Sequence, residues 1–207
     1  MLPHAKALTG EQSTEKALKQ TSGPNILHIA THGFFLKDIG AATADTRGLG
    51  LLGEGPTTIP AARLENPLLR SGLALAGANQ RKSGDDDGVL TAMEGAALDL
   101  WGTKLVVLSA CNTGVGEVKN GDGVYGLRRA LVLAGSESQV MSLWSVSDKG
   151  TQELMIAYYT ALQQGQGRSE ALRGVQLKML KSKERRHPYY WASFIQSGEW
   201  ANLEGKR

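Results

Sequence analysis

Two reactive side chains, one thiol and one imidazole, each follow an apolar run at a point where a buried strand is expected to end. Cys111, the only cysteine of the 207 residues, stands in "LVVLSACNTG", and His32 stands in "ILHIATHGFF". Functional groups of parallel α/β sheets gather just past the carboxyl ends of the strands. If these two strands are neighbours, the imidazole lowers the thiol pKa and later protonates a leaving amine. This pattern is the minimum for acyl transfer by a cysteine.

Gly33, directly after the histidine, suits the same chemistry. Its backbone N–H approaches a substrate carbonyl with no side chain in the way, and the N–H of Cys111 provides a second candidate donor. One donor of such an oxyanion hole is typically worth about 10²–10³ in rate. On spacing alone the simpler interpretation is different, because a lone cysteine is often an inert buried residue. His28, inside the strand before His32, is interpreted as structural.

Composition narrows the class of protein. The chain is 41% hydrophobic and 21% charged, which excludes a disordered or fibrous class. A net charge of +3 is too small to indicate a nucleic-acid partner, and the basic run at 178–186 is interpreted as the solvated end of a helix. A single cysteine excludes an intrachain disulfide framework and zinc sites made of several thiolates. We therefore predict a cytoplasmic protein with no cofactor, no metal and no membrane partner. The chain shows no obvious leader and is interpreted as a possible piece of a longer protein.

Strand and helix patterns alternate along the chain, which predicts one α/β domain with a mostly parallel central sheet. A capping box is expected at Thr91 and Glu94. The region 37–68 has no clean period and is expected to be a loop or insertion. Strands are predicted at 25–30, 71–77, 104–110, 138–144 and 189–195, and helices at 11–20, 123–135, 149–165 and 168–182.

Two short motifs look like ligand sites and are set aside. "GDGVYG" (121–126) satisfies the glycine spacing of a dinucleotide loop, but it begins some ten residues after the preceding strand ends, and the acid expected after the next strand is missing. "GDDDG" (84–88) lacks the spaced ligands of a calcium loop and is interpreted as a solvated turn.

Six blocks resemble the CHAT family in the same order, across about residues 8–198. They are "ILHIATHGFF", "NPLLRSGLALAG", "LVVLSACNTG", "GDGVYGLRRALVLAG", "VMSLWSVSD" and "HPYYWASFIQSG". CHAT domains are caspase-like cysteine peptidases often found behind TPR repeats, so the resemblance implies a caspase-like α/β/α sandwich. It also implies a regulatory TPR-type domain or partner and a bacterial defence or cell-death setting.

The resemblance assigns roles to particular residues. His32 matches the catalytic histidine, Cys111 the nucleophile, and Gly33 the glycine that helps to bind the oxyanion. The local signature is Ser109-Ala110-Cys111-Asn112-Thr113 rather than that of animal caspases. The distance from His32 to Cys111 (111 − 32 = 79 residues) exceeds the roughly 50 residues of caspases, and we attribute the excess to a flap or regulatory loop at 37–68.

These roles predict a cysteine endopeptidase that cleaves protein or peptide substrates through a Cys–His dyad and an acyl-enzyme intermediate. The alternative is a catalytically silent interaction module whose partner binds the same groove. Asp148 lies where related enzymes place a pocket wall, so its carboxylate is a candidate partner for a basic substrate side chain. The simpler interpretation of Asp148 is the N-cap of the following helix.

Overall fold

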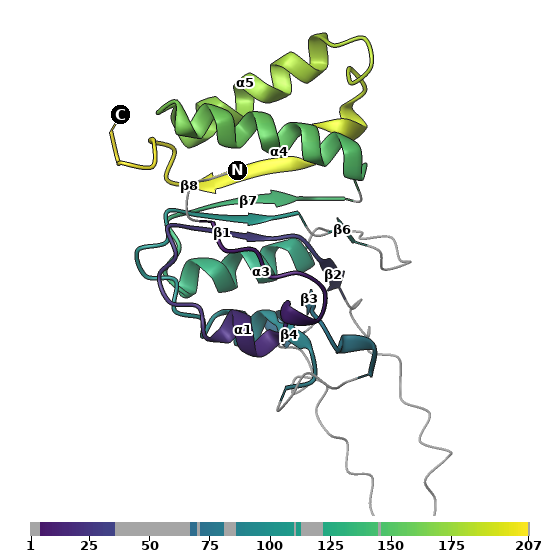
Figure 1. Ribbon diagram of the computed structural model, residues 1–207, viewed down its shortest axis with the longest axis vertical. Coiled ribbons are helices and arrows are strands. Elements are labelled where there is room, and N and C mark those ends of the chain that lie inside the picture. Colours follow the sequence, from purple (N-terminus) through teal and green to yellow (C-terminus); the bar gives the residue numbers. More distant parts are fainter. Residues whose placement is uncertain are drawn as a thin grey trace, which may run out of the picture.

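The computed structural model describes residues 5–35, 67–69, 71–80, 86–109, 111–112, 122–144 and 146–206, and the structural statements below concern these residues. Its centre is a four-stranded sheet in the order β1-β5-β7-β8. The first three strands run parallel and the last antiparallel, as Figure 1 shows. The strands are β1 (Ile26–Ile29), β5 (Leu105–Leu108), β7 (Ser138–Ser142) and β8 (Phe194–Gly198). The predicted fold class, an α/β sandwich with a mostly parallel central sheet, is confirmed.

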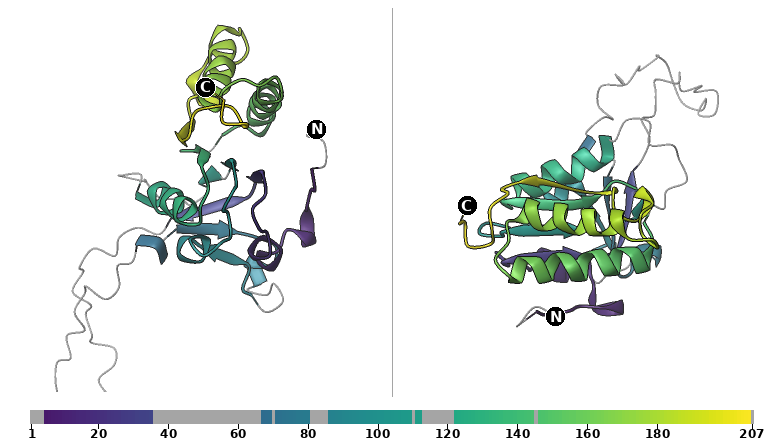
Figure 2. Two further views of the ribbon diagram at one scale, coloured as in Figure 1. Left: turned by 90° about the vertical axis from the view of Figure 1, so that its left-hand side faces the viewer. Right: turned by 90° about the horizontal axis from the view of Figure 1, so that it is seen from above.

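Helices cover both faces of this sheet (Figures 1 and 2). One face carries α4 (Asp148–Gln163) and α5 (Arg168–Lys181). The other face carries α3 (Asp122–Leu133), with the short helices α1 (Glu15–Lys19) and α2 (Ala92–Gly95) beyond it. The capping box predicted at the start of α2 is confirmed, because the Thr91 hydroxyl accepts from the Glu94 N–H and the Glu94 carboxylate accepts from the Thr91 N–H.

The parallel strands are buried on both sides, which explains why β5 reads as a continuous apolar run. Val106 and Leu108 belong to the core under α3, where the apolar face of that helix is buried. Leu105 and Val107 belong to the core under α4 and α5. The helix residues buried in these two cores include Leu127, Ala130, Leu131 and Ala134 of the α3 segment and Leu154, Tyr158, Ala161 and Leu162 of α4.

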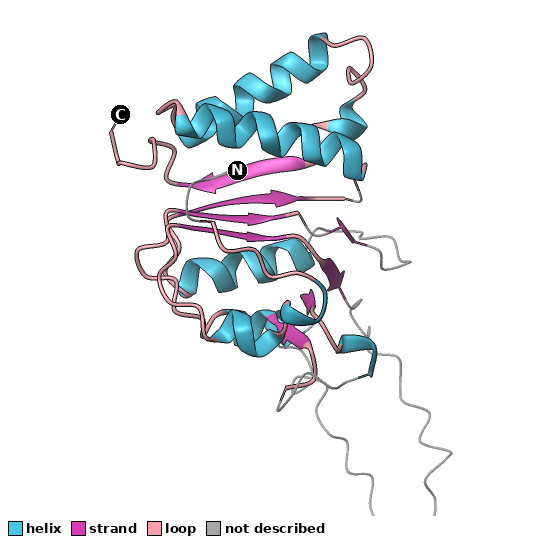
Figure 3. Cartoon of the chain, viewed as in Figure 1, coloured by secondary structure: helices cyan, strands magenta, loops and turns pink. Residues whose placement is uncertain are grey.

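A second, smaller sheet lies past the carboxyl ends of β1 and β5, with the order β4-β3-β2-β6 (Figure 3). β2 (His32–Phe35) pairs antiparallel with β3 (Ser71–Ala74) and parallel with β6 (Cys111–Asn112). β4 (Val89–Thr91) pairs with β3. Three of its strands, β2, β4 and β6, were not predicted, because β4 and β6 have only three and two residues and "HGFF" of β2 shows no alternation of apolar and polar residues.

Two predicted elements are wrong in their bounds. The strand expected at 189–195 is a 3-10 turn at η5 (Pro188–Tyr190) followed by β8 at 194–198. Pro188 fixes a turn conformation at its own position, and the His187 ring accepts from the Tyr189 N–H, 3.2 Å away, so this stretch cannot join the sheet. The helix expected at 11–20 is a 3-10 turn, η1 (Gly10–Gln12), and then α1, because Thr14 caps α1 by accepting from the Ala17 N–H.

The loop or insertion predicted at 37–68 lies outside the described residues except for its end, where η3 (Pro67–Leu69) precedes β3. A further 3-10 turn, η4 (Ala78–Gln80), follows β3. Among the described helices, none combines the length and apolar character that a membrane crossing requires.

Candidate functional site

The strands that lead to His32 and Cys111 are direct neighbours, which is the condition that the sequence analysis set. β1 and β5 pair in parallel with Ile29 opposite Leu108. The ladder continues one residue further, because the Ser109 N–H donates to the Ile29 carbonyl at 3.1 Å. The two chain segments therefore leave the central sheet side by side.

The second sheet then brings the two candidate catalytic positions opposite each other. His32 is the Cα register partner of Cys111, and Gly33 is the partner of Asn112. Neighbouring strands lie about 4.7–4.9 Å apart, so the two backbones are adjacent. For Cys111 the structure describes the backbone only. Both residues open short strands of a second sheet, whereas the sequence predicts them only at the ends of the preceding strands.

Equal connections explain this register. Two residues, 30 and 31, separate β1 from β2, and two residues, 109 and 110, separate β5 from β6. Since Ile29 and Leu108 are already partners in the first sheet, equal spacing leads to His32 and Cys111 as partners in the second. The pairing of the two candidate residues is therefore inherited from the register of the core.

The His32 position is held from its other side as well. β3 pairs with β2 so that Ala74 lies opposite His32, and the Thr31 hydroxyl donates to the Ala74 carbonyl. His32 is exposed, and the glycine after it is buried. Gly33 lies within β2, between β3 and β6, so its predicted oxyanion role remains a prediction.

His28, interpreted as structural from the sequence, contacts two polar partners at the same end of the sheet. Its Nε2 lies 3.0 Å from Ser109 Oγ, and its Nδ1 lies 2.9 Å from the Tyr159 hydroxyl of α4. Burial of the ring lowers the pKa of His28, and since the residue as a whole stays exposed, we expect that lowering to be modest. Ser109 and Tyr159 were missed by the sequence analysis. Only the place of Ser109, two residues before Cys111, could have drawn attention to it.

Asp148 is the first residue of α4 and is exposed. It is not the N-cap, as the simpler interpretation had it. That position belongs to Ser147, whose hydroxyl accepts from the Gly150 N–H at 3.3 Å. A carboxylate in the first turn favours the helix through its dipole, so a helical role still accounts for Asp148. Its role toward substrate stays a prediction.

The motifs set aside earlier show no ligand geometry where they are described. α3 begins at Asp122, inside "GDGVYG", and 113–121 lie outside the described residues. In "GDDDG", Asp86 accepts from the Lys19 ammonium at 3.1 Å and Asp87 accepts from the Val89 N–H at 2.9 Å. Within the described ranges, no three His, Cys, Asp or Glu side chains cluster as metal ligands would.

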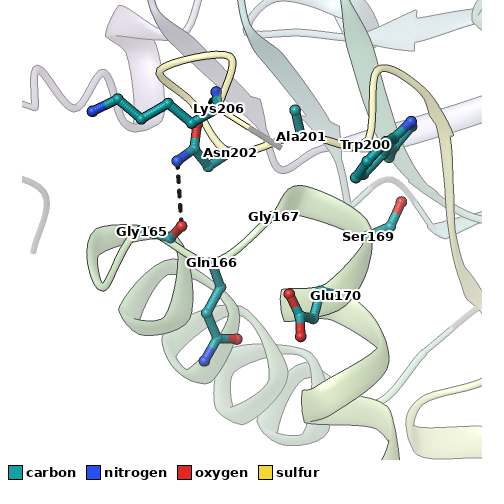
Figure 4. Close-up of a pocket in the computed structure, with 9 residues that line it drawn as sticks. All are labelled: Gly165, Gln166, Gly167, Ser169, Glu170, Trp200, Ala201, Asn202 and Lys206. Carbon is teal, nitrogen blue, oxygen red and sulfur yellow. Dashed lines mark hydrogen bonds between the residues drawn. The ribbon is translucent and has the colours of Figure 1, made fainter.

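A cavity of about 520 Å³ lies elsewhere, between the turn that joins α4 to α5 and the segment after β8 (Figure 4). Gln166, Glu170 and Trp200 line it, and Asn202 donates to the Gly165 carbonyl at 3.4 Å across one end. Gly198 of β8 pairs with Ser138, the first residue of β7, so this cavity lies at the amino end of the parallel strands. The cavity therefore lies at the opposite end of the parallel strands from His32 and Cys111.

The fold is that of an α/β sandwich with a mostly parallel central sheet. The chain belongs to the CHAT family, since the model of the CHAT domain matches residues 1–199. It is also 34% identical over 115 residues to the human protein named tetratricopeptide repeat protein 28, which covers 56% of this chain. The mouse protein of the same name is 33% identical over 100 residues, or 48% of this chain. These alignments span 5% and 4% of the relatives' own lengths.

Proposed function

We propose that this domain is a cysteine endopeptidase that uses Cys111 and His32. The observation that carries the proposal is the β2–β6 register, in which these two positions are partners. Membership of the CHAT family, a caspase-like peptidase-related family, supports it. The described backbone provides what a dyad needs first, which is proximity of thiol-bearing and imidazole-bearing positions.

The chemistry would run in two halves. The thiol proton passes to His32, and the thiolate of Cys111 attacks the peptide carbonyl to form a tetrahedral oxyanion, for which the N–H groups of Gly33 and Cys111 are the proposed donors. The C–N bond then breaks as His32 gives the proton to the leaving amine. Water, with His32 as base, adds to the thioester and releases the acid and the free thiol.

Because Cys111 is the only cysteine, its ionisation can be measured on the intact protein. The alkylation rate with iodoacetamide across pH 5–10 reports the thiol pKa directly. We expect an inflection well below the ordinary value of about 8.5 in the wild type, and near 8.5 in His32→Gln. His187→Gln is the matched control, because His187 is an exposed histidine that begins the η5 turn and lies outside the proposed site.

Cleavage itself is tested with a library of peptides from a digested proteome. Incubation with the wild type should create new termini that are absent with Cys111→Ala and with His32→Gln. An ordinary thiol pKa together with no Cys111-dependent cleavage would overturn the proposal. Equal binding of a protein partner by the wild type and Cys111→Ala, without cleavage, would support the interaction-module alternative instead.

We further propose that Asp148 selects a basic side chain before the scissile bond. Fluorogenic peptides with Arg, Lys, Leu, Met or Asp at that position provide the test. Asp148→Asn should reduce cleavage after Arg and Lys more than after Leu, while Glu170→Gln, at another exposed acid, on α5, should change neither. Equal rates on basic and apolar peptides in the wild type would contradict this assignment.

The setting of the domain is also proposed. The relatives' names refer to tetratricopeptide repeats, which is consistent with a regulatory repeat domain or partner. Both relatives are mammalian, so the predicted bacterial setting draws no support from them. Addition of a candidate repeat partner to the peptide-library assay should change the cleavage rate of the wild type.

A further inference from the structure

We propose that His28 is a positioning residue for the nucleophile, because it links Tyr159 of α4 to Ser109 and so holds the β5–β6 connection that leads to Cys111. This inference rests on the peptidase function proposed above and adds a residue set to the same site. The link joins three elements of different layers: β1, α4 and the chain that leaves β5. The other hydrogen bond of Ser109 among the described residues is made by its backbone N–H.

The geometry of the link is complete at both ring nitrogens. Nε2 lies 3.0 Å from Ser109 Oγ, and Nδ1 lies 2.9 Å from the Tyr159 hydroxyl. The two aromatic rings lie with their centroids 5.8 Å apart at an interplanar angle of 44°, so Tyr159 also limits rotation of the imidazole. A neutral imidazole has one donor and one acceptor, and it satisfies both neighbours in either tautomer.

Tyr159 is adjacent to a residue of the core. Its chain neighbour Tyr158 is fully buried in the core between α4 and the sheet. Ser109 is fixed from the other side, because its N–H donates to the Ile29 carbonyl at 3.1 Å. One residue separates Ser109 from Cys111. A shift at Ser109 is therefore passed to the nucleophile over a single residue.

The link carries no charge at neutral pH. Burial lowers the pKa of His28 and raises the pKa of Tyr159, so the imidazole is neutral and the phenol is protonated. A neutral link adds no charge beside the proposed proton transfer from Cys111 to His32. Its contribution is alignment, and a displacement of about 1 Å in an active site can cost about 10²-fold in rate.

A matched pair of adjacent tyrosines provides the test. Tyr159→Phe removes the hydroxyl that contacts His28, whereas Tyr158→Phe removes a buried hydroxyl with no hydrogen-bond partner among the described residues. Ser109→Ala breaks the link from its other end. For each variant, the alkylation rate of Cys111 is measured from pH 5 to 10 on the folded protein.

If the link aligns the thiol with His32, Tyr159→Phe and Ser109→Ala should each raise the thiol pKa by about one unit. Alkylation well below the pKa then slows by about tenfold and returns to the wild-type rate near pH 10, where every thiol is ionised. Tyr158→Phe should match the wild type. A purely structural role would lower the unfolding midpoint without moving this profile.

Two results would overturn the inference, and they are distinguishable. A low thiol pKa in the wild type that stays unchanged in both Tyr159→Phe and Ser109→Ala removes the positioning role and leaves the proposed peptidase intact. A thiol pKa near 8.5 in the wild type removes the positioning role, and together with the absence of Cys111-dependent cleavage it removes the proposed peptidase as well. His28→Gln, which keeps one donor and one acceptor, should lie closer to the wild type than His28→Leu.

Discussion

Replacement of Arg168 by lysine is expected to destabilise the fold strongly while it leaves the charge in place. The guanidinium, at the start of α5, is fully buried. Nη1 donates to the Lys104 carbonyl at 2.8 Å and to Ser138 Oγ at 3.1 Å. Nη2 donates to Glu137 Oε2 at 3.1 Å and to the Asn202 carbonyl at 3.2 Å. One side chain thus joins the starts of β5, β7 and α5 to the C-terminal segment.

The magnitude follows from these four contacts. Lysine has one nitrogen on a flexible stem, and it cannot place donors where the two Nη atoms of the arginine fork lie. At least two of the four hydrogen bonds are then lost, and one such bond contributes about 0.5–1.5 kcal/mol, or up to about 3 kcal/mol when the donor is charged. We expect Arg168→Lys to lower the free energy of unfolding by about 2–4 kcal/mol, a large part of the 5–15 kcal/mol typical of a domain.

Urea unfolding followed by tryptophan fluorescence measures this loss. With a slope of about 2 kcal/mol per molar urea, the midpoint should fall by about 1–2 M. Arg173→Lys is the matched control, because Arg173 lies on the exposed side of α5, and it should change the free energy by less than about 0.5 kcal/mol. A loss at Arg168 no larger than that of the control would refute the reasoning.

Three further predictions concern the stability of the fold. Gly198→Ala places a Cβ 2.3 Å from the Glu137 carbonyl oxygen at a φ of +88°, and it should lower the free energy of unfolding in urea by several kcal/mol. Gly165→Ala, at a φ of +81° in open space, should lower it by about 1 kcal/mol. Similar losses in the two variants would contradict the clash at Gly198. Thr91→Ala removes the N-cap of α2 and should cost about 1 kcal/mol by the same assay, so no loss would show that the cap is dispensable. The lowered pKa of His28 means that the unfolded chain takes up the proton first as the pH falls below about 6.5. The unfolding free energy should therefore decline between pH 7 and 5 more steeply in the wild type than in His28→Gln, and parallel slopes would argue against it.

The elements of the central sandwich are predictable from the sequence because their signals are local. β5 is four apolar residues buried on both faces, and α4 repeats its apolar residues at helical spacing, as at Leu154, Tyr158 and Leu162. The capping box at Thr91 is likewise a local pattern of two residues at fixed spacing. In each case the residues that create the pattern are also those that the structure buries or bonds.

The second sheet and the polar link are not predictable in this way. β6 has two residues and β4 has three, which are too few to show an alternation of apolar and polar side chains. The link depends on Tyr159, which is far from His28 in the chain and reaches it only because α4 crosses the sheet. Strand pairing and helix placement are tertiary properties, so the periodicity of residues within a segment does not predict them.

The candidate site is thus best understood as a continuation of the core. The β1–β5 register places Ile29 opposite Leu108, and equal two-residue connections carry this alignment to His32 and Cys111. A change in either connection would slip one strand against the other, and a slip of one residue in a sheet moves every side chain to the opposite face. The Ser109–His28–Tyr159 contacts hold the β5–β6 connection, which contains Ser109. The Thr31 hydroxyl holds the β1–β2 connection to β3. Polar contacts therefore occur where apolar packing ends, at the segments whose length determines whether the two proposed catalytic positions stay paired.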